Sequence, residues 1–159
     1  MLICGLYLAD ATTHLSLKTL RTRGGWAERE GFYSSELWRD QDVVHRVRHT
    51  RARAQEMTSC NGIAARLTWA CLHPDITSVP VYVTFSIADV ATNIIATSTQ
   101  WQTLVLPLPC NLYQQRVRFS VSADRTWSGA GCGINADKRD IGVTLRDVEW
   151  CGSIGMFAP

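Results

Sequence analysis

Apolar and polar residues alternate along several short stretches of the chain, and this period of two constrains the fold more than any other feature. In residues 116–122, Val117, Phe119 and Val121 alternate with arginine and serine, and residues 81–87 repeat the pattern with valine, phenylalanine and isoleucine. Successive side chains of a β-strand point to opposite faces of its sheet. The pattern therefore predicts strands with one buried face.

Helical periodicity is almost absent, and turn residues recur at short intervals. The candidate strands are 14–20, 43–49, 51–57, 63–71, 81–88, 94–97, 101–108, 115–122 and 141–150. Short strands at this spacing are typical of a two-sheet sandwich. We therefore expect an all-β protein with a two-sheet antiparallel β-sandwich, arranged as a jelly roll.

The chain of 159 residues fits one domain, and it contains no internal repeat or linker. We expect a single domain over residues 1–159, in which 1–13 form an N-terminal arm or edge strand. Residues 23–42 lack clean alternation and predict a long loop. That loop either presents its aromatic residues at the mouth of the sandwich or uses them to plug the end of the core.

Composition excludes several classes of protein. The net charge of +2 is too small to imply a polyanionic partner by itself. No apolar run approaches the ~20 residues that span a bilayer. Residues 1–9 are apolar but lack the positive start of a secretory leader. The six cysteines show no zinc-ligand spacing, so we expect free thiols and a cytoplasmic location.

Four arginines and two histidines fall within nine residues: His45, Arg46, Arg48, His49, Arg51 and Arg53. With a turn at Thr50, the arginines could form a ridge for phosphate or nucleic acid. The alternative, which the modest net charge favours, is a solvated strand face paired with nearby glutamates. His45 and His49 would lie about 13 Å apart on one strand, which is poor geometry for a metal.

The sequence gives no support to an enzyme. It holds neither a G-x-S-x-G elbow nor a glycine-rich phosphate loop after a strand. The paired acids, Asp137 with Asp140 and Asp147 with Glu149, would need a cleft to shift their pKa values. We expect no catalysis, no cofactor and no bound metal, although a structural calcium ion stays open.

Carbohydrate recognition needs flat aromatic faces beside planar polar groups. The predicted loops supply the aromatic residues Trp26, Tyr33, Trp38 and Trp127 and the polar residues Glu36, Asp137 and Arg139. Trp69, Trp101 and Trp150 fall in predicted strands, where we expect core positions. Trp127 is the tryptophan with the least evident structural role, because it follows a strand end and precedes Ser128-Gly129.

Two short motifs resemble a known family. Gly31-Phe32-Tyr33-Ser34-Ser35-Glu36 matches G-[WF]-[YH]-x-x-E, and Asp137-Lys138-Arg139-Asp140-Ile141-Gly142-Val143 resembles D-x-R-x-L-G-[VL]. With Arg46-Val47 between them, where the family has Arg-Trp, the order resembles the β-sandwich accessory domain of bacterial glycosyltransferases and methyltransferases that build cell-surface polysaccharides. The resemblance covers most of the chain after about Trp26.

That resemblance implies a non-catalytic jelly roll like the galactose-binding domains, with a carbohydrate role. Glu36, Arg46, Asp137 and Arg139 match the family's polar positions, and they either bind ligand or clamp the loop onto the last strand by pairing Glu36 with Arg46 or Arg139.

Our leading hypothesis is a module that binds a bacterial surface glycan through Tyr33, Glu36, Trp38, Arg46, Trp127, Asp137 and Arg139. The alternative is an assembly module without a sugar ligand. In that case the chain pairs with itself or with a protein partner through an exposed sheet face, on which Arg116, Arg118 and Arg146 alternate. Nucleic acid ranks last among the possible partners, and a membrane is not expected.

Overall fold

A computed structural model describes residues 29–40 and 43–152, which form one antiparallel sheet of nine strands. The strands are β1 (Arg29–Phe32), β2 (Glu36–Asp40), β3 (Val43–Ser59), β4 (Ala64–Ala70), β5 (Val81–Ile87), β6 (Val90–Ala96), β7 (Gln102–Pro107), β8 (Arg116–Ala123) and β9 (Thr144–Cys151). A single 3₁₀ turn, η2 (Cys110–Leu112), lies between β7 and β8. The expected all-β antiparallel fold is confirmed.

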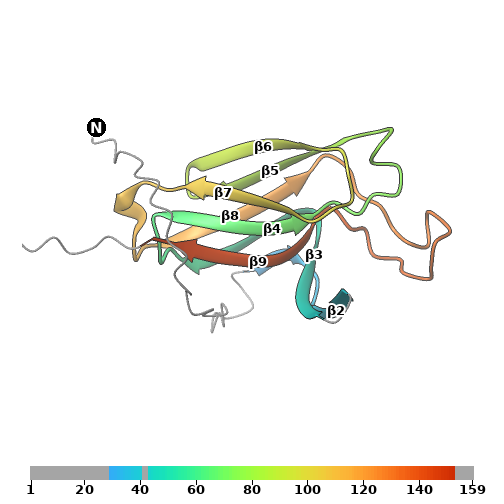
Figure 1. The fold of residues 1–159 in the computed structure, drawn as a ribbon, viewed down its shortest axis with the longest axis horizontal. Helices are drawn as coiled ribbons and strands as arrows, with labels where there is room; N and C mark the ends of the chain where they lie inside the picture. Colours follow the sequence, from blue (N-terminus) through green and yellow to red (C-terminus); the bar gives the residue numbers. More distant parts are fainter. Residues whose placement is uncertain (1–28, 41–42, 153–159) are drawn as a thin grey trace, which may run out of the picture.

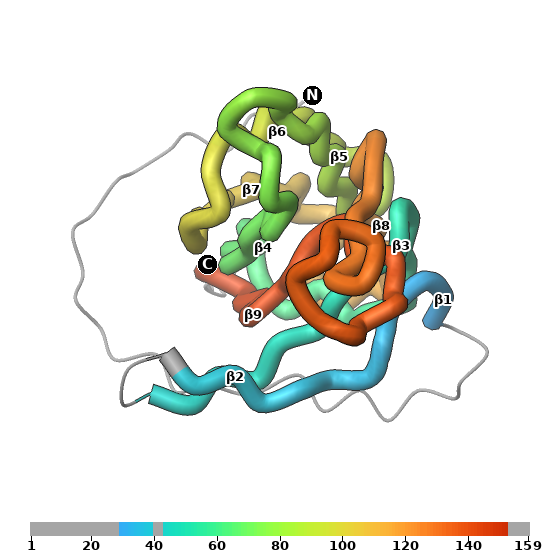
Figure 2. The backbone as a smooth tube through the Cα atoms, turned by 90° about the vertical axis from the view of Figure 1, so that its right-hand side faces the viewer, coloured from blue at the N-terminus to red at the C-terminus, as the bar shows by residue number. Residues whose placement is uncertain are grey.

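The long strand β3 joins the parts of the sheet. Its second half pairs with β8, while Arg48 and His49 pair with β9, and its first residues pair with β2. The strands therefore follow the order β6-β5-β8-β3-β9-β4-β7 without interruption. Figure 2 shows that this sheet curls around an interior and nearly closes, while β2 and the start of β3 extend away from the ring of strands.

The inward side chains of the curled sheet form one core. In β5, Val81, Val83, Phe85 and Ile87 are buried while the residues between them are not, as the alternation predicted. Trp69 from β4 packs against Phe85 from β5, with 5.1 Å between ring centroids. This contact links strands from opposite parts of the sheet. Trp69 therefore occupies the expected core position, whereas Trp101 and Trp150 are only half-buried.

Two of the expected strand boundaries are wrong. Thr50 does not end a strand, because β3 runs without interruption from Val43 to Ser59 and buries Thr50 in its middle. The backbone N–H of Val143 donates to the Thr50 hydroxyl at 3.0 Å, so this position needs the side-chain oxygen. The second is the gap between the expected strands 81–88 and 94–97, which is shorter than expected. β6 begins at Val90 because Ala88, with φ at 50°, makes the turn after β5.

Residues 29–40 also differ from the expected long loop at 23–42. They contain β1 and β2, which both pair with β3. The expected N-terminal arm at 1–13, the candidate strand at 14–20 and Trp26 lie outside the described residues.

One end of the molecule carries the segments that resemble the family motifs. The connection from β8 to β9 projects beyond the strands at this end, and the β2–β3 hairpin lies toward the same end (Figure 1). Trp127 and Ile141 pair as an isolated antiparallel bridge at the base of the projecting loop. No helix within residues 29–40 and 43–152 has the length and apolar character needed to cross a bilayer.

Candidate functional site

The glycines of both motifs lie against the backbone of β3. Gly31 has φ at 75°, and a Cβ built on it would stand 2.0 Å from the carbonyl oxygen of Arg53. A Cβ on Gly142 would stand 2.5 Å from the carbonyl oxygen of Arg51. Only glycine allows so close an approach without a shift of the backbone. The two motif segments are therefore brought together across one short stretch of β3.

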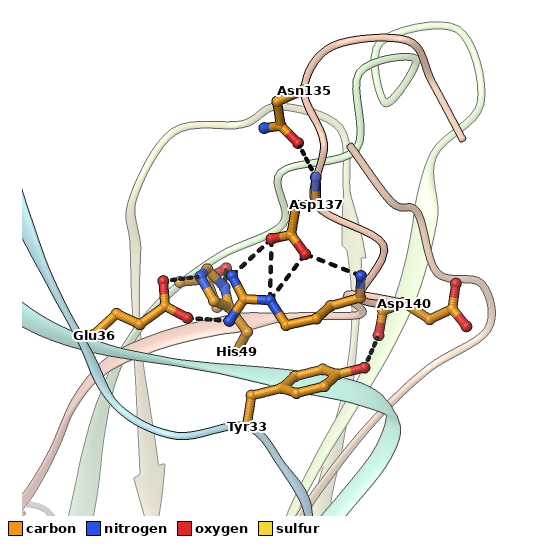
Figure 3. Close-up of polar contacts among 8 residues, drawn as sticks. Tyr33, Glu36, His49, Asn135, Asp137 and Asp140 are labelled. Carbon is orange, nitrogen blue, oxygen red and sulfur yellow. Dashed lines mark hydrogen bonds and ion pairs between the residues drawn. The ribbon is translucent and has the colours of Figure 1, made fainter. Parts of the chain in front are cut away.

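Arg139 is the centre of the polar cluster that results. Its guanidinium donates to Glu36 from β2, and it also donates to Asp137 through Nε at 3.0 Å and Nη2 at 2.7 Å. Figure 3 shows Glu36, His49 and Asp137 gathered around these contacts, with Tyr33 beneath. The side chains of Arg139, Glu36 and Asp137 are each about one-third exposed, so the cluster faces solvent.

Short local hydrogen bonds shape the loop that carries Asp137. The side-chain oxygen of Asn135 accepts from the backbone N–H of Asp137 at 2.8 Å. A carboxylate oxygen of Asp137 accepts in turn from the backbone N–H of Arg139 at 3.0 Å. Such side-chain turns are the usual role of Asn and Asp in loops. They fix the direction from which Asp137 meets the guanidinium.

The guanidinium keeps both carboxylates ionised. Hydrogen bonds from Arg139 lower the pKa of Asp137 to about 2. Its hydrogen bond to Glu36 lowers the pKa of that carboxyl as well, against the opposing effect of partial burial. The pKa of Arg139 itself is raised by the same two partners. The site therefore carries two negative charges and one positive charge at any ordinary pH.

His49 closes the inner side of the cluster. It is buried in β3, where burial lowers its pKa and so favours the neutral ring. Its Nδ1 lies 2.8 Å from the hydroxyl of Thr144, and its Nε2 lies 3.8 Å from a carboxylate oxygen of Glu36. A neutral ring in this place separates the charged cluster from the core.

Two aromatic rings flank the cluster. The Tyr33 hydroxyl donates to the backbone oxygen of Asp140 at 3.2 Å, and the Arg51 and Arg139 guanidinium carbons each lie 5.5 Å from its ring centroid. On the other side, the ring of the half-buried Trp38 packs edge-on against His49 and Trp101, with centroid separations of 5.5 Å and 6.4 Å. Of the predicted site residues, Tyr33, Glu36, Trp38, Asp137 and Arg139 are therefore brought together.

Two predicted residues are not placed in this cluster. Arg46 is exposed on the β2–β3 hairpin and donates to the Ser35 hydroxyl at 3.1 Å, while Glu36 pairs with Arg139 instead. Trp127 is half-buried, and its indole N–H is buried with no partner among the described residues. Its backbone pairs with Ile141 in both directions. Trp127 therefore lies at the base of the loop, where its backbone, and not its indole N–H, forms the hydrogen bonds.

The predicted arginine groups do not form single surfaces. Arg48 turns to the buried Glu56 and Arg51 lies over Tyr33, so the four arginines of 46–53 form no ridge. Arg116 and Arg118 lie outward on β8. Arg146 instead lies on β9, paired with its neighbour Asp147 and placed over the Trp101 ring.

Four residues of the site are not among the predicted ones: His49, Trp101, Asn135 and Thr144. The alternation of inward and outward residues along β3 could have revealed His49, because His49 lies two residues after Val47 and shares its inward face. Nothing in the local pattern indicated Trp101, which lies directly before β7 and packs against Trp38 with 6.4 Å between ring centroids. Asn135 could have been recognised from its spacing of two residues before Asp137, which is typical of side-chain turns.

Within the part of the chain that the structure describes, no group of three or more His, Cys, Asp or Glu side chains is placed to hold a metal ion. The fold and the cluster together define an all-β protein with a solvent-facing carboxylate–guanidinium site at one end of its sheet. Comparison with protein-family models and with curated proteins finds no match to this chain.

Proposed function

We propose that this chain is a non-catalytic carbohydrate-binding module whose site is the Arg139 cluster. The observation that supports it best is the convergence of Tyr33, Glu36, Asp137 and Arg139, which come from segments about 100 residues apart, on one solvent-facing position. These four residues are among those that the sequence predicted, from their side-chain chemistry and from the two motifs.

The cluster has the groups that a sugar requires. Each ionised carboxylate keeps lone pairs for sugar hydroxyl donors, and the guanidinium has five N–H groups, of which Glu36 and Asp137 use only part. Charge-assisted hydrogen bonds of this kind are the strong ones. Trp38 is half-buried at the side of the cluster, where the exposed part of its ring can pack against the apolar C–H face of a sugar.

The same electrostatics argue against glycoside hydrolysis. A glycosidase needs one carboxylic acid with a raised pKa to protonate the leaving group. Arg139 lowers the pKa of both Glu36 and Asp137, so neither is suited to that role. The neutral, buried His49 does not face solvent directly. This favours a site that binds a sugar without transforming it.

We further propose that the curled sheet is a galactose-binding-like jelly roll of the accessory-domain type found with polysaccharide glycosyltransferases and methyltransferases. The support is the shared role of the two motifs: their glycines pack on β3 and their charged residues pair with each other. On this proposal the ligand is a bacterial surface glycan and the protein acts in the cytoplasm.

A glycan array tests the proposal directly. The full chain is applied beside Trp38→Ala, Asp137→Asn and Trp127→Ala, with Tyr113→Phe as the matched control because Tyr113 follows η2 at the opposite end of the sheet (Figure 1). We expect hits that Trp38→Ala and Asp137→Asn abolish and that the control keeps. A folded protein that binds no glycan, or hits unaffected by both variants, would contradict the proposal.

An assembly module is the second candidate, and one observation favours it. The β2–β3 hairpin extends from the ring of strands with Leu37, Val43 and Val44 exposed at 68%, 55% and 51%. Apolar side chains at such exposure are common at protein–protein contacts. Concentration-dependent size in sedimentation, lost in Leu37→Asp, would support this function in place of the first.

A further inference from the structure

The outward face of β5, β8 and β3 is a second surface with a defined chemistry, on the other side of these strands from the core. Because Val83, Phe85, Val117, Phe119 and Val121 are buried inward, their neighbours in the alternation point outward. We name this surface the outer face. Its residues are Tyr82, Thr84 and Ser86 on β5, Arg118, Ser120 and Ser122 on β8, and Arg53, Gln55 and Met57 on β3.

The centre of the outer face consists of small hydroxyl groups. Thr84 is opposite Ser122, and Ser86 is opposite Ser120. The hydroxyls of Ser86 and Ser120 lie 2.6 Å apart, and the Thr84 hydroxyl donates to the amide oxygen of Asn93 at 2.7 Å. A hydroxyl has one donor and two acceptor positions. The hydroxyls of Thr84, Ser86 and Ser120 are therefore each held by a neighbour and still have capacity for a ligand.

Two exposed arginines lie along this strip of hydroxyls. Arg53 is opposite Ser122 and Arg118 is opposite Met57, which places them about 13 Å apart along the strands. Neither guanidinium meets a carboxylate among residues 29–40 and 43–152. Two carboxylates lie beside this face: Glu30 on β1, which accepts from the Gln55 side-chain amide at 2.9 Å, and Asp124 after β8, which accepts from the backbone N–H of Tyr82 at 3.0 Å. The residues of the face on β3, β8 and β5 therefore carry two positive charges and no acid, while Glu30 flanks them from β1.

An aromatic and aliphatic pair completes the surface at the β6 side. Tyr82 and Ile95 are cross-strand partners and are exposed at 59% and 55%. A protein interface of standard size relies on several buried aromatic anchors, and serine and threonine rarely contribute to its binding energy. The outer face has one aromatic ring and a centre of hydroxyls. This composition fits a hydroxylated, negatively charged chain better than it fits a protein.

We propose that the outer face binds an acidic polysaccharide that carries carboxylates. Arg53 and Arg118 take two carboxylates of the chain in the forked geometry that guanidinium prefers. The hydroxyl strip meets the sugar hydroxyls between them, and Tyr82 packs against a sugar ring. This inference rests on the proposed function only in taking carbohydrate as the ligand class, because it uses a surface separate from the Arg139 cluster.

The test is calorimetric titration of the full chain with oligogalacturonate, beside the same oligomer with its carboxyl groups reduced to alcohols. We expect binding of the acidic oligomer and at least about tenfold weaker binding of the reduced one. Arg53→Gln combined with Arg118→Gln should weaken binding of the acidic oligomer about tenfold. Arg66→Gln is the matched control, since Arg66 is an exposed arginine on β4, outside this face.

Three results would overturn the inference: no binding of oligogalacturonate, equal binding of the reduced oligomer, or an equal loss in the Arg66→Gln control. Oligothymidylate serves as a competitor, and its displacement of oligogalacturonate at lower concentration would assign the surface to nucleic acid instead. Titration of Asp137→Asn separates the two proposals. If Asp137→Asn abolishes array binding but leaves oligogalacturonate binding intact, both sites stand. If only the double arginine variant has an effect, the Arg139 cluster is not a sugar site.

Discussion

Arg139 and Glu36 are 103 residues apart in the sequence, yet they form an ion pair that connects the β2 hairpin to the loop before β9. Both side chains are about one-third exposed, so solvent screens the pair in part. In this position Glu36 also lies 3.8 Å from Nε2 of His49 and close enough to Asp137 for the two carboxylates to affect each other's charge. The contact therefore organises the site as well as joining the two segments.

A double-mutant cycle measures this contact. We expect Glu36→Gln and Arg139→Gln to show a coupling energy of about 1 kcal/mol in urea unfolding, since the pair is hydrogen-bonded but partly screened. The pair of Arg66 and Glu149 is the matched control, because it is more exposed and its atoms lie 3.5 Å apart. Its coupling should be only a few tenths of a kcal/mol. Equal coupling in the two cycles would mean that Arg139 has no special structural role.

The glycine of the first motif should tolerate no side chain. Gly31→Ala places a Cβ against the Arg53 carbonyl in a left-handed backbone conformation, and we expect a loss of about 3 kcal/mol in the free energy of unfolding. Gly133 provides the control, because its φ of 70° is similar but no atom lies within 4 Å of its added Cβ. Gly133→Ala should cost about 1 kcal/mol. If both variants lose the same stability, the close approach to β3 is unimportant and only the backbone conformation matters.

Much of the fold could be predicted because the strands alternate cleanly. The inward residues of β5 and β8 follow directly from their period of two. β1 and β2 could not be found this way, since four and five residues carry little periodicity and both depend on pairing with β3. The continuity of β3 through Thr50 was hidden for a related reason. The partner that makes Thr50 favourable inside the strand, Val143, is 93 residues away.

The candidate site could be predicted only in part, because the pairing of β2 with β3 could not be read from the sequence. Glu36, Asp137 and Arg139 were selected from short motifs, and the structure pairs them directly. Arg46 and Trp127 were selected by the same reasoning but do not join the cluster. For Arg46 the cause is strand parity, because it is opposite Leu37 on the exposed face of the hairpin while Glu36 is on the other face. Such parity could not be read before β2 was known to be a strand.

Stability should fall as the solution becomes acidic, because two histidines are buried in the neutral state. Burial lowers the pKa of His73 and of His49 below the ordinary value of 6.5. The unfolded chain therefore binds more protons than the folded one below that pH, so the stabilisation is complete above a pH of about 6.5 and is lost below it. For His73, the nearby Arg125 strengthens the effect, and Asp75 and Asp124 oppose it.

Urea unfolding at several pH values checks this behaviour. The His73 ring makes no full hydrogen bond among the described residues, although the backbone of Arg125 interacts with it and raises its pKa, so His73→Leu removes a titrating group with the loss of that one weak contact. We expect this variant to lose part of the decrease in stability below pH 6.5 while keeping a folded structure. An unchanged pH profile would show that His73 becomes protonated without any cost to the fold.

The buried Glu56 gives the largest expected effect of an ion pair. Its carboxylate receives two hydrogen bonds from Arg48, both at 2.9 Å, and one from Arg29 at 3.0 Å. Burial by itself would raise the pKa of Glu56, but these arginines outweigh it and lower the pKa. Arg48→Met should therefore cost about 3 kcal/mol, since it leaves a buried charge without its main partner. Part of that loss should be recovered at low pH, where the carboxyl is protonated in both states.

Arg29→Met is the natural comparison, because Arg29 reaches the same carboxylate from a side chain that is 43% exposed. A solvent-exposed pair is worth at most about 1 kcal/mol, so this variant should unfold at nearly the wild-type urea concentration. Unfolding curves of both variants at neutral and acidic pH distinguish the two roles. If Arg48→Met and Arg29→Met are equally mild, Glu56 must become protonated when Arg48 is removed, and a raised pKa for that carboxyl in the variant would be the direct check.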